Sequence, residues 1–387
     1  MLNEEKTREL FEQFTTKITY FTGDVAIIGK GTASLLMIPS LIRSGANITI
    51  FHDSETKELG VGESTVPTVQ KQLTSVNLFI YQLIKKNIAS YKTGVRFFGW
   101  GDSEKFDHPF GSNDLAFHFY TRDFNKFLVE HYSKNFNCKF IDQKVDKVFE
   151  DDGGVYINGS KFDAVVHASG WSENLTTYIS SPFETVNSGV TFTEYPHTAY
   201  TSTVHRATED GWQFELPYPE SNKSRCGYLF NRKFSNEESI LKKFEGRVES
   251  YLKWNPRYSE KLIVSKRQAL IGNALFFFEP LQAFSTHYYC VFSDMIAEYL
   301  GNIGDQKKID SLNTRYTNLI LDYLRVIAFH YKKGSKYKTP YWIDIQKRAN
   351  QFCPDDITSF RFFTDFDYNI IKNGINGENF IGETLNE

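Results

Sequence analysis

The sequence predicts an α/β fold in which a βαβ unit is combined with an antiparallel sheet layer and a C-terminal helical lobe. Three observations lead to this prediction. An apolar run near the N-terminus ends in a glycine-rich turn, apolar and polar residues alternate in the middle of the chain, and helical periodicity dominates from about residue 286 onward. With 387 residues, the chain is long enough for one large domain or for two intimately packed ones.

The βαβ unit is predicted from residues near the N-terminus. The run DVAIIG at 24–29 is typical of a strand that is buried on both faces. The segment LLMIPSLIRSG at 35–45 has helical periodicity, with Pro39 inside it and Gly45 as a stop signal. The run NITIFH at 47–52 predicts the second strand, so the three elements form a right-handed crossover unit.

Antiparallel strands are predicted for the middle of the chain and helices for its end. Residues 144–169 are typical of a β-meander that leads into a further buried strand, and alternating strands recur in 189–207 and 226–234. The segment at 310–333 has a long helical pattern. We therefore expect three parts. A discontinuous first module covers 20–180 and 265–300, a central antiparallel sheet covers 181–264, and a helical lobe covers 301–387.

Charge and cysteine content exclude several classes of function. Lys and Arg number 44 and Asp and Glu 47, a net charge of −3, so no overall bias toward nucleic acid or an anionic membrane is present. The four cysteines are far apart and form no CxxC pair, which predicts neither a metal site nor a disulfide scaffold. No apolar run approaches the roughly 18–20 residues of a membrane span, and the charged N-terminus predicts a cytoplasmic protein. A small molecule is therefore the expected partner.

The turn GKGTAS joins the first predicted strand to its helix. Gly29 and Gly31 stand where a dinucleotide-binding fold needs a tight turn and a close approach of the backbone to pyrophosphate. Ser34 replaces the third glycine of that pattern, so an ordinary glycine-rich turn is the alternative. The second strand ends at His52 and Asp53, either of which could hold ribose hydroxyl groups, with Asp53 the better acceptor.

A larger set of motifs resembles the flavin-dependent halogenases of the tryptophan halogenase family, a branch of the FAD monooxygenase fold. GKGTAS resembles the family's GGGTAG, and GVGESTVPTVQK at 60–71 is similar to its GVGEATVP segment. Further segments follow in the family's order, namely RFFGWG, HPFG, GWQFELP, GYLFNRKFSNEES, IGNALFFFEPLQAFSTH and DYLRVIAFHYK. The resemblance covers about residues 24–345 and implies a Rossmann-like FAD-binding module, with the helical lobe on the substrate side.

The resemblance also implies the cofactor site and the other reactants. Reduced FAD would be supplied by a separate flavin reductase and used with oxygen and a chloride, bromide or iodide ion. A strap that includes Gly60 and Gly62 lies between the cofactor and substrate sites in the family. The residues that the resemblance places against FAD are Gly29, Gly31, Thr32, Ala33, Ser34, His52, Asp53, Gly60, Gly62, Glu63, Ser64, Gly272 and Asn273.

The resemblance places the family's catalytic lysine at Lys71. Pro67 suits the first turn of a helix, and Lys71 follows it by four residues on the same face. In such enzymes halide oxidation gives hypohalous acid. A buried ammonium group either donates a hydrogen bond to its oxygen or is itself halogenated, and so directs the halogen at one carbon of an aromatic ring. Without the surrounding match, Lys71 would be read as a solvated helix residue.

The segment EPLQAFSTH departs from the family pattern EPLEST. Gln282 replaces a Glu that pairs with the lysine, and we expect it to orient hypohalous acid through hydrogen bonds without acting as a general base. Ala283 and Phe284 replace Ser and Thr. Halide binding needs no particular side chain, so the backbone N–H groups of Phe284 and Ser285 are expected to provide it.

Two further segments predict the substrate side. His108, Pro109 and Phe110 match a family segment that stacks on planar substrates, although His108 also fits a surface turn. Trp212 and Phe214 match the WxWxIP signature, although alternating aromatics also fit a strand in the core. The resemblance predicts halogenation of an indole, phenol or pyrrole. An FAD-dependent aromatic monooxygenase and a halogenase-derived FAD-binding protein without turnover are the alternatives.

Overall fold

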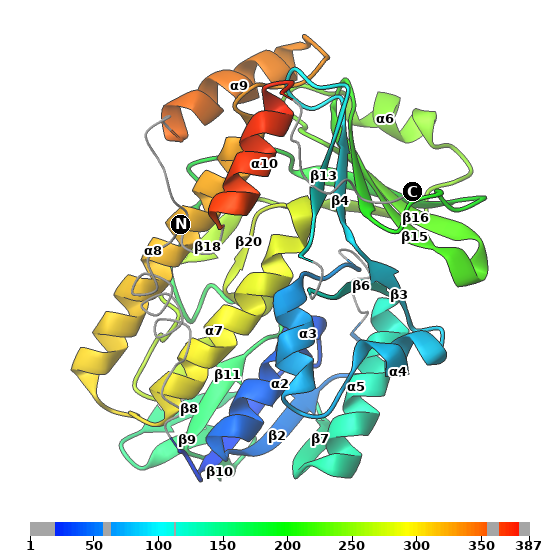
Figure 1. Ribbon diagram of the computed structural model, residues 1–387. Helices are drawn as coiled ribbons and strands as arrows, with labels where there is room; N and C mark the ends of the chain where they lie inside the picture. The colour runs from blue at the N-terminus through cyan, green and yellow to red at the C-terminus, as the bar shows by residue number, and fades with distance from the viewer. Residues whose placement is uncertain (1–19, 57–62, 112–113, 354–363, 379–387) are drawn as a thin grey trace.

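The computed structural model describes residues 20–56, 63–111, 114–353 and 364–378. A five-stranded parallel sheet occupies the lower half of Figure 1, and a seven-stranded sheet occupies the upper half. The predicted α/β class with an antiparallel layer and C-terminal helices is confirmed.

The parallel sheet contains the predicted βαβ unit at its centre. Its strand order is β19 (Gln268–Leu270), β11 (Ala164–His167), β1 (Asp24–Ile28), β2 (Asn47–His52) and β7 (Cys138–Asp142). Helix α2 (Thr32–Ser44) connects β1 to β2 and ends at Gly45, whose φ of 92° is a left-handed conformation that favours glycine. Because β1 lies between two parallel neighbours, Val25, Ala26 and Ile27 are fully buried, as the continuous apolar run predicts.

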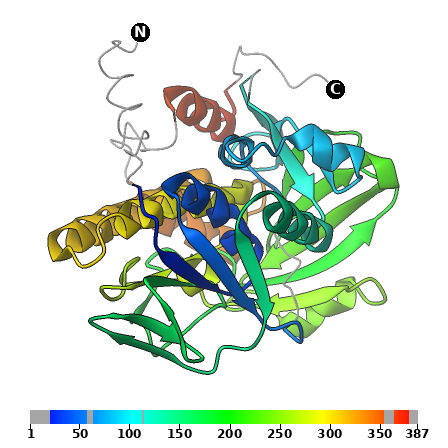
Figure 2. The ribbon, with the colours of Figure 1, turned by 90° about the horizontal axis from the view of Figure 1, so that it is seen from below.

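A small antiparallel sheet covers one face of the parallel sheet. It consists of β8 (Val148–Asp151), β9 (Gly154–Ile157) and β10 (Ser160–Phe162), which confirms the predicted meander. The buried side chains between the two sheets are Ala26, Phe51, Val155, Ile157, Phe162 and Val165. The opposite face carries α2 and α5 (Thr121–Asn135), as the view from below shows (Figure 2).

The large sheet is antiparallel except where β14 and β4 run parallel. Its strand order is β17 (Ser250–Lys253), β13 (Ser188–Glu194), β16 (Lys223–Phe230), β15 (Gly211–Tyr218), β14 (Thr203–Ala207), β4 (Gly94–Phe98) and β5 (Lys105–Pro109). Helix α6 (Glu237–Lys243) covers part of one face. The β4–β5 hairpin comes from the segment that the sequence assigned to the first module, so the sheet extends beyond 181–264.

Shorter elements connect the two large sheets. They are α3 (Pro67–Thr74), α4 (Ile80–Lys85), the pair β3 (Ala89–Lys92) and β6 (Ala116–Phe119), and the small sheet of β12 (Tyr178–Ser180), β18 (Arg257–Ser259) and β20 (Phe276–Phe277). Helix α3 begins at Pro67, as predicted.

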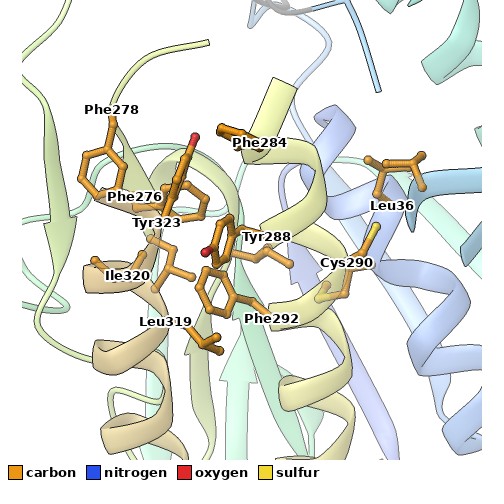
Figure 3. Packing of buried hydrophobic residues seen from close by; sticks show 14 of the residues in the cluster. Leu36, Phe276, Phe278, Phe284, Tyr288, Cys290, Phe292, Leu319, Ile320 and Tyr323 are labelled. Carbon is orange, nitrogen blue, oxygen red and sulfur yellow. The ribbon is translucent and has the colours of Figure 1, made fainter. Parts of the chain in front are cut away.

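The C-terminal helices are α7 (Phe284–Leu300), α8 (Gln306–Tyr331), α9 (Pro340–Phe352) and α10 (Asp365–Ile375). An aromatic cluster joins α7 to α8, in which the ring of Tyr323 stacks on Tyr288 at 4.5 Å and meets Phe278 edge-on at 5.3 Å (Figure 3). Helix α10 packs against β5, where Ser103 Oγ donates a hydrogen bond to the Gly374 carbonyl oxygen.

All four cysteines are buried, and no disulfide joins any two of them. Within the described parts of the chain, none of the helices combines the length and the apolar character that crossing a membrane requires.

Candidate active site

The turn after β1 contains two glycines, which differ in whether the fold itself requires glycine at that position. Gly29 has a φ of 110°, and a Cβ there would lie 2.7 Å from the carbonyl oxygen of Ala168, so the protein itself requires glycine. Gly31 is the N-cap of α2 and has an ordinary φ of −76°. A Cβ added to Gly31 would meet nothing within 4 Å. Open space at the N-terminus of α2 fits the pyrophosphate of a bound dinucleotide.

The hydroxyl groups of this turn bind other protein groups. Thr32 Oγ1 donates to Asn125 Oδ1 at 3.1 Å, and Ser34 Oγ donates to the Gly31 carbonyl oxygen at 2.7 Å. Ser34, which replaces the third glycine of the fingerprint, is 1% exposed, so its hydrogen bond to Gly31 lies inside the protein. Anion contacts at this turn are then left mainly to the backbone.

The second predicted cofactor segment lies against the first. Gly272 begins the 3-10 helix η2 (Gly272–Ala274) with a φ of 65°, and a Cβ there would lie 2.7 Å from the Cβ of Ala33. Asn273, the next residue, is partly buried. The structure therefore brings the GKGTAS turn and the Gly272-Asn273 segment together, although they are far apart in the sequence.

His52 and Asp53 lie at the carboxyl end of β2, the same sheet edge as the GKGTAS turn. His52 Nδ1 lies 3.5 Å from Asp142 Oδ1, and burial, followed by the charge of Lys30, lowers the pKa of His52. Asp53 is partly buried and accepts a hydrogen bond from the Glu55 amide at 3.0 Å. Both side chains are at the edge where a ribose group would lie.

Gly60 and Gly62 lie outside the described residues. Glu63, which follows them, is 5% exposed. One of its carboxylate oxygens accepts a hydrogen bond from the Thr121 amide at 3.1 Å, and the other lies 3.5 Å from Arg225 Nε. Burial raises the pKa of Glu63. These contacts anchor the end of the predicted strap to the N-terminus of α5.

Lys92 is a buried residue that sequence reasoning missed. Its ammonium group donates to Ser64 Oγ at 3.0 Å and to the Thr65 carbonyl oxygen at 2.8 Å, and it lies 5.3 Å from the ring centre of Phe110. Lys92 is 2% exposed, and burial lowers its pKa to about 7. The sequence signal that could have identified Lys92 is a lysine at an inward-facing position of a short alternating strand. Lys92 joins a predicted cofactor residue, Ser64, to a predicted substrate residue, Phe110.

Lys71 projects from α3 into solvent. Its side chain is 71% exposed, and its ammonium group lies 3.0 Å from Asp114 Oδ1. The expectation of a buried ammonium group is therefore wrong for the structure described here. Exposure of this lysine depends on segments distant in sequence, which local periodicity does not specify.

Helix α3 is tied to the first turns of α7. Thr68 Oγ1 and His287 Nδ1 lie 2.8 Å apart, and burial lowers the pKa of His287 to about 4. Lys71 follows Thr68 by three residues and therefore lies on a neighbouring part of the same helix face. Helix α3, which carries Lys71, is therefore in contact with the start of α7, whose first residues are Phe284 and Ser285.

The predicted halide segment has a left-handed turn before α7. Gln282 and Ala283 have φ values of 51° and 61°, which are unusual for residues with a side chain. The Phe284 N–H donates to the Leu281 carbonyl oxygen. Ser285 is in the first turn of α7, where N–H groups have no intrahelical partner, so it is the better placed of the two predicted donors.

Gln282 is 2% exposed, and its amide lies between two histidines. Its Oε1 lies 2.7 Å from His108 Nδ1, and its Nε2 lies 2.6 Å from His330 Nε2. His108 Nε2 in turn lies 2.9 Å from Asp367 Oδ1 on α10. Sequence reasoning missed His330 and Asp367, because neither is near position 282 in the sequence and Asp367 lies beyond the family-like segments.

The predicted substrate residues lie on or next to two strands of the large sheet, β5 and β15, which β14 and β4 separate. His108 is 3% exposed within β5, so the surface-turn alternative is wrong. Pro109 and Phe110 are partly buried. Trp212 and Phe214 are 0% and 6% exposed on β15. Burial of these two side chains agrees both with the family motif and with an ordinary core strand.

Comparison with known proteins agrees with this arrangement. The sequence profile described as tryptophan halogenase matches residues 24–116 and 112–362. The chain is 21% identical over 427 residues to tryptophan 7-halogenase RebH of Lentzea aerocolonigenes, an alignment covering 84% of the chain and 78% of that protein.

Solved structures share the fold. The tryptophan halogenase of Shewanella frigidimarina NCIMB 400 has a TM-score of 0.79 at 16% identity, covering 96% of this chain and 92% of that one. BrvH, a flavin-dependent halogenase from Brevundimonas sp. BAL3, has a TM-score of 0.79 at 17% identity, covering 93% and 91%. The profile match spans most of the chain and includes both the glycine turn at α2 and the segment that begins α7. The chain therefore belongs to the tryptophan halogenase family, whose members are flavin-dependent enzymes that halogenate aromatic compounds.

Proposed function

We propose that this enzyme uses reduced FAD, supplied by a separate flavin reductase, together with oxygen as the oxidant of a chloride, bromide or iodide ion, and that Lys71 directs the resulting hypohalous acid to an electron-rich indole, phenol or pyrrole. The cofactor contacts proposed for FAD are at the GKGTAS turn, at His52 and Asp53, at Glu63 and Ser64, and at Gly272 and Asn273.

One observation carries the proposal. The start of α7 is joined to α3 through the hydrogen bond between Thr68 and His287. Earlier in the chain, η2 lies against the glycine turn, where Gly272 approaches Ala33. These two contacts support a common location for the proposed lysine helix, halide segment and cofactor turn. This is the arrangement that passing an oxidised halogen from cofactor to substrate requires.

The chain's own groups have separate tasks in this proposal. Reduced FAD, when bound, would supply halide oxidation through its reaction with oxygen. The open space at Gly31 accepts the pyrophosphate, and the Ser285 N–H donates to the halide ion. Lys71, an exposed ammonium group, donates a hydrogen bond to hypohalous acid at the mouth of the site. An exposed lysine supports a site that is open to substrates larger or less uniform than one free amino acid.

The test is a comparison of Lys71→Ala with Lys85→Ala, a change at a second lysine that lies in the last turn of α4. We expect Lys71→Ala to bind FAD and consume oxygen like the wild type, but to lose most of its halogenated product. Mass spectrometry of an indole and phenol panel, with a flavin reductase and each halide, measures the product. We expect Lys85→Ala to retain it.

Two results would count against the proposed role of Lys71. Full product yield from Lys71→Ala would mean that hypohalous acid leaves the protein freely. Equal losses in the two variants would mean that lysine removal acts through general surface charge.

A further inference from the structure

The hydrogen bonds around Gln282 determine where protons lie in a buried chain of polar groups. The carbonyl oxygen of Val326 can only accept, so His330 Nδ1, 2.7 Å away, carries a proton. A neutral His330 then accepts from Gln282 Nε2, and Gln282 Oε1 accepts from His108 Nδ1. The remaining ring nitrogen, His108 Nε2, faces a carboxylate oxygen of Asp367, which also accepts.

The hydrogen bonds above give His108 two protonated ring nitrogens and therefore a positive charge. Rotating the amide of Gln282 would move this charge to His330 without removing it. With Oε1 toward His330, both nitrogens of His330 would have to donate, while His108 would be neutral. That arrangement places a cation on His330, which is fully buried between a carbonyl and an amide. Burial lowers the pKa of His330 to about 3, which opposes this arrangement. A carboxylate lies next to His108 instead, and the pKa of Asp367 is lowered through its hydrogen bond and charge interaction with His108, against the opposing effect of burial.

We infer that His108 is an imidazolium ion at neutral pH, held by Asp367 on α10, and that this ion pair fixes the amide of Gln282 in one orientation. Among the described residues, the polar groups that face His108 include Asp367 from α10, His330 from α8 and Gln282 from the turn before α7. Asp367 and His108 are then positioning residues, and Gln282 is a hydrogen-bonded spacer.

The two histidines beside position 282 need one acceptor and one donor, which an amide supplies. The amide can accept from one histidine and donate to the other, whereas a carboxylate could only accept. Under the proposed function, on which this step alone rests, the ion pair also holds the left-handed turn at Gln282 and Ala283. That turn sets the direction of the first N–H groups of α7.

Helix α10, which carries Asp367, is held against the core of the protein. The Asp102 amide donates to the Ile375 carbonyl oxygen at 2.8 Å, and Ile371 and Ile375 are buried against the core. The second carboxylate oxygen of Asp367 accepts from Thr364 at the start of α10. Each oxygen of Asp367 therefore has its own partner.

The experiment is nitrogen NMR of the full chain labelled with ¹⁵N-histidine at neutral pH. The His108 signal is assigned as the one lost in His108→Gln among the nine histidines. We expect two protonated ring nitrogens on His108 and one on His330 in the wild type. Asp367→Asn can donate from its amide to His108 Nε2 and still accept from Thr364, so it removes the charge with little change in shape. We expect His108 to retain only its Nδ1 proton in this variant.

The matched control is Asp365→Asn, which changes an exposed carboxylate in the first turn of the same helix. We expect it to leave the His108 signal unchanged. A single protonated nitrogen on wild-type His108, or two on His330, would overturn the inference. An Asp367→Asn signal identical to the wild type would do so as well. None of these signals depends on halogenation, so failure of the proposed function would be seen separately.

Discussion

At the scale of single residues, a substitution at Gly31 is expected to weaken cofactor binding with little effect on folding. A Cβ at this position meets nothing within 4 Å and the backbone has an ordinary φ, so the fold has no need of glycine there. We expect Gly31→Val to change the free energy of unfolding by no more than about 1 kcal/mol. FAD affinity should fall by about tenfold or more, because the side chain occupies the space proposed for pyrophosphate. Denaturant unfolding and titration of flavin fluorescence measure the two quantities.

Gly29→Ala is the matched comparison. Its Cβ would collide with the Ala168 backbone at a φ of 110°, so we expect the fold itself to lose about 1–3 kcal/mol. Unchanged FAD affinity in Gly31→Val would remove this turn from the cofactor site.

Gln282→Glu tests the direction of the hydrogen bonds at position 282. The new carboxylate would face the acceptor nitrogen of His330, so we expect a loss of about 1–3 kcal/mol of stability at pH 8. Protonation of His330 relieves the conflict, and the carboxylate raises its pKa in the folded variant. Stability gained in this way is present at low pH and is lost as pH rises. The deficit relative to wild type in urea unfolding should therefore be smaller at pH 6 than at pH 8, and an equal deficit would contradict the assignment.

The residues of the site differ in how far the sequence could predict them. The glycines of the turn after β1 have local causes, a tight turn and a close approach, and local sequence specifies both. The partners of His108 are fixed by tertiary packing, since Asp367 is 259 residues away and Gln282 is 174 residues away. No spacing or periodicity brings such residues together in advance.

At the scale of elements, Lys92 links β3 to the chain segment before α3. The folded protein holds the pKa of Lys92 at about 7, against 10.5 as its ordinary value, so the unfolded chain binds more protons between these values. This lysine therefore makes stability rise with pH above about 7, by up to roughly 1.4 kcal/mol per pH unit. We expect Lys92→Met to remove that contribution, so that wild type gains more stability than the variant between pH 7 and pH 9.

Lys71→Met is the control for this measurement, because it replaces an exposed lysine by the same residue. Its stability should follow the wild type at both pH values. Parallel pH dependence of wild type and Lys92→Met would mean that Lys92 is not buried as an ammonium group between Ser64 and Thr65.

Most elements were predictable from the sequence because their causes are local. The apolar run of β1, the stop at Gly45, the proline that begins α3 and the meander of β8 to β10 all lie where the pattern indicates. Pairing between distant elements was not predictable. The β4–β5 hairpin joins the large sheet through the parallel pair of β14 and β4, which no alternation within either strand specifies.

At the scale of the whole molecule, the predicted site residues come from both large sheets. The parallel sheet provides the glycine turn and η2, whereas the large sheet provides His108 and the neighbouring aromatic residues. Helix α10 packs against β5 of the large sheet, in the upper part of Figure 1. The order of family-like segments could predict the membership of the chain, but the exposure of Lys71 follows from how the sheets and helices pack.

The central claim is that the enzyme transfers an oxidised halogen to an aromatic ring. The most direct test is mass spectrometry of one fixed indole incubated with the full chain, a flavin reductase, FAD, oxygen and bromide. The account predicts a product with the paired isotope peaks of one bromine, which disappears when bromide is left out. A hydroxylated product that forms equally without halide would contradict the account and indicate a monooxygenase, and hydrogen peroxide without any aromatic product would indicate a flavoprotein that has lost turnover.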